Sequence, residues 1–208
     1  MIVSAEMRRF WANACPDQFD AWFRSGSPSP GEGCREDEYV HERGQTELGI
    51  KRRGEKPGIE IKGLVAVLPQ SCDPAPFVGA IEIWCKWPSS ALALRDLPTV
   101  KIKKNRWLRK FDMTGAEPVE IPMGKDEAPT DHRPIPHEGC NVELTRIELE
   151  QKQVWWTLGF EAFGELFTVE RNLRAALSVM AARRPPPFAP GDLLSYPAWL
   201  DKHVRRQP

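Results

Sequence analysis

The segment Glu47-Leu48-Gly49-Ile50-Lys51-Arg52-Arg53 alternates apolar and charged side chains in the manner of a β-strand. Because successive side chains of a strand point to opposite faces, Leu48 and Ile50 share one face, while Lys51 and Arg53 share the other. The alternation recurs along the chain, at Ile59-Glu60-Ile61-Lys62, Ile81-Glu82-Ile83-Trp84-Cys85-Lys86, Val100-Lys101-Ile102-Lys103-Lys104-Asn105-Arg106 and Val142-Glu143-Leu144-Thr145-Arg146-Ile147-Glu148. These segments predict a sheet with one apolar face and one charged face, and the many cations on the charged face indicate a polyanionic ligand.

The same pattern has a simpler interpretation, because an antiparallel sheet with one face in water also alternates apolar and charged residues. Two observations favour a ligand site over a solvated face. The cationic strands are followed by strands that carry carboxylates, and the order of the pieces resembles that of a known family.

Composition limits where such a ligand could bind. The 208 residues suffice for one domain with a sizeable core. The 29 basic and 29 acidic residues cancel, so no overall field attracts the chain to nucleic acid or to an anionic membrane. We therefore expect a local anion site, a small-molecule partner and no nucleic acid.

The cysteines and the apolar segments bear on the compartment. Five cysteines occur at wide spacing without a Cys-x-x-Cys pair, which is typical of reduced thiols rather than of a disulfide framework or a zinc site. No segment approaches the ~20 apolar residues that span a bilayer, and the N-terminus lacks the features of a signal peptide. We expect a cytoplasmic protein with no membrane association.

The expected elements assemble into an α+β fold. We expect a short helix at 16–24, an amphipathic helix from Glu165 to 183, and strands at about 2–11, 39–42, 46–54, 58–68, 78–87, 99–104, 106–112, 141–150 and 153–163. A long proline-rich loop joins 112 to 139. This pattern predicts an antiparallel, closed or strongly curved β-barrel whose polar interior forms a tunnel, with the helices packed outside. Residues 1–208 are expected to form one domain, on which a proline-rich tail, 184–208, docks through aromatic side chains.

Several short motifs follow one another in a defined order. They are Ser4-Ala5-Glu6-Met7-Arg8, Gly49-Ile50-Lys51-Arg52-Arg53, Ile59-Glu60-Ile61-Lys62, Lys104-Asn105-Arg106, Val142-Glu143-Leu144-Thr145, Gly159-Phe160-Glu161-Ala162-Phe163 and Ser195-Tyr196. In this order the sequence resembles the CYTH domain of the triphosphate tunnel metalloenzyme superfamily over about residues 2–200. That superfamily includes inorganic and thiamine triphosphatases, RNA triphosphatases and class IV adenylate cyclases.

The resemblance implies a role for each type of inward side chain. Guanidinium and ammonium groups from opposite walls would hold a triphosphate, and the candidates are Arg8, Lys51, Arg53, Lys62, Lys86, Lys104 and Arg106. Glu6, Glu143 and Glu161 would hold Mg²⁺ or Mn²⁺, which prefer oxygen ligands, and Glu143 and Glu161 are the catalytic candidates. Each glutamate also has a simpler interpretation, in which it only pairs with a neighbouring inward cation.

The sequence departs from the family pattern at two carboxylate positions. Ser4 stands where the family has its first glutamate, and Phe163 stands where a second late carboxylate is expected. The leading hypothesis is a divalent-metal-dependent hydrolase of an inorganic or organic triphosphate. The alternatives are a catalytically degenerate protein of the same fold that binds phosphate ligands, an adenylate cyclase-like enzyme, and a non-catalytic interaction module with exposed charged strands. Which triphosphate would bind, and the oligomeric state, stay open.

Overall fold

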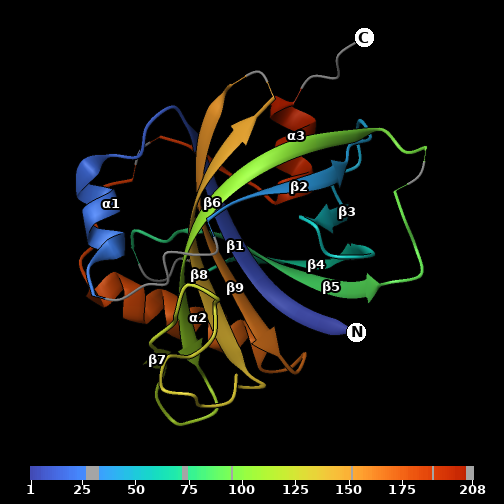
Figure 1. Cartoon of the computed structure of the whole chain (residues 1–208). Coiled ribbons are helices and arrows are strands. Elements are labelled where there is room, and N and C mark those ends of the chain that lie inside the picture. Colours follow the sequence, from blue (N-terminus) through green and yellow to red (C-terminus); the bar gives the residue numbers. More distant parts are fainter. Residues whose placement is uncertain (27–32, 72–74, 95, 151, 189, 205–208) are drawn as a thin grey trace.

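The alternating segments form antiparallel strands that close on themselves (Figure 1). The computed structural model describes residues 1–26, 33–71, 75–94, 96–150, 152–188 and 190–204. Within these ranges, eight strands follow one another around the barrel in the order β1-β5-β4-β3-β2-β6-β8-β9, and β9 pairs with β1. Their bounds are β1 Ile2–Ala12, β2 Cys34–Val40, β3 Leu48–Arg53, β4 Ile59–Ser71, β5 Gly79–Ser89, β6 Thr99–Asp112, β8 Gly139–Leu149 and β9 Val154–Gly164. The predicted α+β barrel is confirmed.

The seam of the barrel joins the first strand to the last long one. β1 and β9 pair along ten positions from Val3↔Gly164 to Ala12↔Trp155. This register places Glu6 opposite Glu161 and Arg8 opposite Gly159. Because side chains at alternate positions share a face, Glu6, Arg8 and Glu161 all point to the inside of the barrel.

Two helices cover the outer face of the barrel. Helix α1, Asp17–Arg24, and helix α2, Val169–Ala182, pack on a core of outward-facing strand residues. The strands contribute Ala5, Met7, Ile81, Val142, Leu144, Leu158 and Phe160, and the helices add Phe19, Phe23, Leu173, Leu177 and Met180. The expected outer helices are confirmed, although α2 begins at Val169 because Glu165 to Thr168 form a turn closed by the Thr168 amide and the Glu165 carbonyl, 2.9 Å apart.

A third helix covers one end of the barrel interior. Helix α3, Tyr196–His203, inserts Trp199, which stacks on Phe10 of β1 with ring centroids 4.9 Å apart. Trp199 belongs to a second apolar cluster with Ile102 and Ile147, which face inward. The described part of the tail contacts the barrel through aromatic side chains, and the short strand β10, Asp192–Leu193, adds to β1. The final tail residues, 205–208, lie outside the described residues. None of the helices described is long and apolar enough to cross a membrane.

The basic run from Lys101 to Lys110 belongs to one strand, not to the two that were expected. β6 continues through Asn105, which pairs with Cys34 of β2 on one side and Arg146 of β8 on the other. Alternation divides the run between two faces. Lys104, Arg106 and Lys110 lie inside, whereas Arg109 lies outside and donates from Nε to the Phe23 carbonyl at the end of α1, 3.1 Å away.

Strand β2 begins earlier than its sequence suggests, at Cys34 rather than at Tyr39. Its acidic residues have low strand propensity, but cationic partners on the neighbouring strands offset this. Glu36 lies 3.7 Å from Lys101 of β6, and Glu38 lies 2.7 Å from Arg52 of β3. The long loop 112–139 also contains a short strand, β7, Val119–Ile121, which pairs with the end of β6.

Candidate functional site

The inward-facing side chains line a cavity of about 310 Å³ inside the barrel. Among the described residues, eight cationic side chains and four carboxylates face this cavity, although the chain as a whole has a formal net charge of zero. The cations are Arg8, Arg35, Lys51, Arg53, Lys62, Lys86, Lys104 and Arg106, and the carboxylates are Glu6, Glu60, Glu143 and Glu161. The structure thus brings together all seven predicted phosphate-binding cations and all three predicted metal-binding glutamates, which come from seven different strands. Their roles stay predictions.

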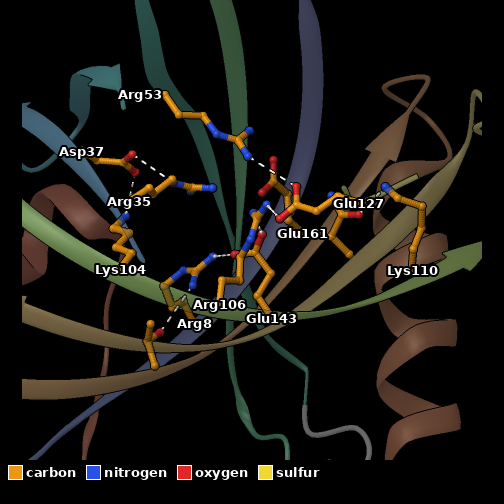
Figure 2. A network of polar contacts seen from close by, with 12 residues as sticks. Arg8, Arg35, Asp37, Arg53, Lys104, Arg106, Lys110, Glu127, Glu143 and Glu161 are labelled. Carbon is orange, nitrogen blue, oxygen red and sulfur yellow. Dashed lines mark hydrogen bonds and ion pairs between the residues drawn. The ribbon is translucent and has the colours of Figure 1, made fainter. Parts of the chain in front are cut away.

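Arginines occupy one part of the cavity and share two carboxylates (Figure 2). Arg106 donates from Nη1 to Glu143 at 2.6 Å, and Arg8 donates from Nη2 to the other oxygen of Glu143 at 3.1 Å. Arg106 also binds Glu127, which accepts a further bond from Arg53 at 3.4 Å. A residue of the long loop therefore joins two strands, β3 and β6, that are not neighbours in the sheet.

Lysine and glutamate pairs occupy another part of the cavity. Lys62 binds Glu6, Lys86 binds Glu161, and Lys51 Nζ lies 3.1 Å from Glu60 Oε2. These six side chains come from β1, β3, β4, β5 and β9. Each carboxylate thus has a cationic partner, as the simpler interpretation of these glutamates expects.

The two family positions that lack a carboxylate have defined contacts of their own. Ser4 is fully buried, and its hydroxyl donates to Glu6 Oε1 at 2.7 Å, so it orients Glu6. The ring of Phe163 lies 4.9 Å from Lys110 Nζ, which also donates to Asn141 Oδ1 at 2.6 Å. Ser4 and Asn141 therefore supply neutral hydrogen-bonding groups to Glu6 and Lys110.

The position of the Arg8 side chain depends on a glycine, Gly159, at the paired position of the neighbouring strand β9. Its guanidinium lies against Gly159, where a Cβ atom would be only 2.3 Å from Arg8 Cζ. The same guanidinium donates to Thr157 Oγ1 at 3.4 Å and lies 5.0 Å from the ring centroid of Tyr196. Arg8 is 9% exposed. The missing side chain at Gly159 therefore makes room for this cation.

Strand β2 supplies three cavity-side residues that the sequence interpretation missed, Arg35, Asp37 and Tyr39. Asp37 is fully buried, and its carboxylate lies 3.0 Å from Arg35 Nε and 3.4 Å from Lys104 Nζ. Lys104 is 4% exposed, donates to the Tyr39 hydroxyl and lies 3.9 Å from the ring centroid of Tyr196. The alternation Arg35, Asp37, Tyr39 would have indicated this face if the acidic segment had been assigned to a strand.

The cations keep the cavity carboxylates ionised. Burial alone would raise the pKa of Asp37, but Lys104, Lys51 and Arg35 outweigh it and lower the pKa to about 2. Burial is likewise outweighed at Glu161, where Lys86 and Lys62 lower the pKa to about 2. Arg106 and Arg8 hold the pKa of Glu143 well below its usual range. All three are therefore anions near neutral pH.

At two of the lysines, burial outweighs the neighbouring opposite charges. It lowers the pKa of Lys62 despite the neighbouring Glu6 and Glu161. It also lowers the pKa of Lys104, although Tyr39 and Asp37 act in the other direction. At Lys86 the attraction of Glu161 and Glu6 exceeds the effect of burial, and the pKa is raised. The cavity thus holds ammonium groups that an additional anion would stabilise in their charged form.

The carboxylates fit a divalent ion only in part. In the described part of the chain, no group of three or more His, Cys, Asp or Glu side chains lies close enough to hold a metal ion. Glu6 and Glu161 face each other across β1 and β9, and Glu143 lies on the next strand. Because Mg²⁺ is often held by one or two carboxylates together with substrate phosphates, this arrangement fits an ion that enters with a phosphate ligand.

Glu127 is the site residue for which the sequence gives no indication. It lies in the loop 112–139, where no periodic pattern predicts which side chains turn inward. Glu148, another acidic residue of the late strands, lies outside the cavity lining and pairs with Arg146 at 3.0 Å.

In comparisons with known proteins, no family model, no curated protein and no solved structure matches this chain. The resemblance to the CYTH domain therefore stays a prediction from the sequence motifs, and the candidate site rests on its own geometry.

Proposed function

We propose that the protein binds a small molecule with several linked phosphate groups, such as an inorganic or organic triphosphate, inside the barrel. The observation that carries the proposal is the convergence of eight cationic side chains on a cavity of about 310 Å³ in a chain without net charge. Cations from different walls can contact successive phosphates, and arginine forks match the oxygens of a phosphate. The charged faces point into the cavity, which supports a ligand-binding function more than an exposed interaction surface.

Weak solvent screening makes such a cavity selective for high charge. Charges that converge in an enclosed site attract an anion more strongly than the same charges spread over a surface. Orthophosphate reaches only a few of the cations at once, whereas tripolyphosphate can reach arginines and lysines together. We therefore expect a larger stabilisation by tripolyphosphate than by orthophosphate at equal concentration.

Two neighbouring arginines provide a matched test. Arg53 faces the cavity, whereas Arg52 is half exposed on the outer face and pairs with Glu38. Arg53→Ala is expected to remove most of the rise in melting temperature that tripolyphosphate causes, and Arg52→Ala, which changes the net charge equally, is expected to retain it. Arg106→Ala is expected to behave like Arg53→Ala. Absence of any stabilisation of the unmodified protein, or equal stabilisation of all variants, would exclude the cavity as the binding site.

Hydrolysis of the bound triphosphate is the second candidate function, and the facing pair Glu6 and Glu161 favours it. A divalent ion held there would neutralise phosphate charge and lower the pKa of a bound water. Lys62 and Lys86, which pair with these glutamates in the free protein, would turn to the phosphate oxygens, while Arg8 and Arg106 stabilise the charge on the leaving diphosphate.

Phosphate release from tripolyphosphate with Mg²⁺ or Mn²⁺ tests this second candidate. Glu161→Gln preserves the size of the side chain and removes its charge, so turnover should fall by about two orders of magnitude or more while tripolyphosphate binding survives. Full activity of this variant, or activity in excess chelator, would contradict the metal role. Binding without turnover in the unmodified protein would favour the catalytically degenerate binding protein.

A further inference from the structure

Glu127 occupies the place of a ligand among the cavity arginines. It comes from the loop between β7 and β8, not from the barrel wall, and its carboxylate contacts both Arg53 of β3 and Arg106 of β6 (Figure 2). No other described residue of this loop forms an ion pair with a side chain that lines the cavity. One loop carboxylate thus bridges two cations that come from different walls.

The loop around Glu127 is folded so that it presents this side chain. The Gly124 amide donates to the Ala128 carbonyl at 2.8 Å, and the Thr130 amide donates to the Pro122 carbonyl at 2.9 Å, which forms a small hairpin. Met123, only 5% exposed, anchors the hairpin on the protein. Glu127 itself has a φ of 58°, a left-handed conformation that costs free energy for a residue with a side chain. The two arginines compensate for this cost by pairing with its carboxylate.

The two arginines retain donors that Glu127 does not use. Arg53 Nε and Arg106 Nε are buried and have no hydrogen-bond partner among the described residues. A carboxylate offers two oxygens, whereas a terminal phosphate offers three and carries a larger negative charge. A phosphate group can therefore satisfy these guanidinium groups more completely than Glu127 does.

We propose that Glu127 is an internal counter-anion, which the phosphate ligand replaces on Arg53 and Arg106, so that the hairpin 122–130 sets the affinity of the cavity. This inference rests on the proposed function. In the free protein the hairpin neutralises the two arginines and stabilises the barrel. When the ligand binds, the Glu127 carboxylate leaves the two arginines. The free energy of the lost ion pairs then weakens the net binding of the ligand.

Calorimetric titration with tripolyphosphate tests the inference on the full chain. Glu127→Gln keeps the size of the side chain but removes the competing charge, and the affinity should rise about tenfold, which corresponds to about 1.4 kcal/mol. Glu117→Gln is the matched control, because Glu117 is an exposed residue between β6 and β7, outside the hairpin 122–130, and its replacement changes the net charge equally. This control should bind like the unmodified protein.

A second variant separates direct contact from overall charge. Glu127→Asp keeps the charge but is one methylene shorter, so it cannot bridge both arginines, and its affinity should also rise.

Melting temperatures of Glu127→Gln, measured without and with ligand, give a further test, because the two expected changes have opposite signs. Without ligand, Glu127→Gln should melt below the unmodified protein, because Arg53 loses its carboxylate partner and Arg106 loses one of its two, whereas its gain with tripolyphosphate should be larger.

The outcomes distinguish this inference from the proposed function. If the unmodified protein binds tripolyphosphate and both Glu127 variants bind with equal or lower affinity, Glu127 is not the internal competitor, and the proposed function stands. If neither the unmodified protein nor any variant binds tripolyphosphate, the proposed function fails, and this inference fails with it. If Glu127→Gln does not fold, Glu127→Asp alone decides, by the same comparison.

Discussion

Adding one methyl group at Gly159 should weaken ligand binding without removing any charge from the cavity. A Cβ atom there would lie 2.3 Å from Arg8 Cζ and 2.4 Å from both terminal nitrogens, which is far inside van der Waals contact. The Gly159→Ala variant must therefore displace the Arg8 guanidinium from its place between Glu143 and Tyr196. Because hydrogen bonds to charged groups contribute about 1.5–3 kcal/mol, the affinity for tripolyphosphate should fall by about 10- to 100-fold.

Gly63→Ala is the control for the glycine-to-alanine change itself. Gly63 also lies in a barrel strand, but on the outer face, and a Cβ atom there would meet its nearest neighbour, Trp87, at 3.5 Å, an ordinary contact. Both variants gain the small strand stabilisation that alanine has over glycine, about 0.5–1 kcal/mol. Calorimetric titration of both variants gives the comparison. An unchanged or higher affinity in Gly159→Ala would refute the role assigned to the placement of Arg8.

Three further outcomes are expected. Trp199→Ala should cost about 3–5 kcal/mol of stability and lower the melting temperature by about 6–20 °C, because it empties the apolar end of the barrel; a smaller loss in thermal unfolding would contradict that role. The folded-state pKa values of Asp37 and Glu161, about 2, lie below the unfolded values of about 4. Their ionised forms therefore stabilise the folded protein above pH 4, and this stabilisation is lost as the pH falls towards 2. Denaturant unfolding between pH 4 and 2 should show the loss of stability, and the loss should be smaller in Asp37→Asn. Burial lowers the pKa values of Lys62 and Lys104, so these lysines lose their charge at a pH below the ordinary lysine pKa of about 10.4. The affinity for tripolyphosphate, measured by calorimetry, should therefore begin to decline before the pH reaches that value. Constant affinity up to that pH would argue against these lysines as ligands of the phosphate.

The period-2 pattern predicted the barrel and, in the strands that it marked, which side chains share a face. Strand β3 shows why, since Lys51 and Arg53 line the cavity while Arg52 between them pairs outside with Glu38. Once one register is assigned, the period fixes the direction of every side chain in that strand. In β1 the same period gives Glu6 and Arg8 one face, which lines the cavity, and Met7 the other, which packs in the outer core.

The features that escaped prediction depend on contacts between distant segments. The acidic start of β2 becomes a strand because Lys101 and Arg52 of its neighbours offset its charges. Ile102 shares the inward face with Lys104 because Trp199 of the tail fills the barrel end, so an apolar side chain there indicates a packed end and not an outer face. Glu127 lies in a loop, where the position of a side chain follows from turn geometry and from its cationic partners. No single segment carries that information.

The seam between β1 and β9 has a consequence for how the chain reaches its folded state. Arg8 and Thr157, which meet across this seam, are 149 positions apart in the sequence. At a synthesis rate of about 5–20 residues per second, the first strand waits about 7 to 30 s on the ribosome before its final neighbour is made. During that interval its apolar face and its unpaired backbone edge are open to other chains. Because the barrel closes through the late pairing of its two ends, we expect slow folding. We also expect that the nascent N-terminal strand needs protection until β9 has been made.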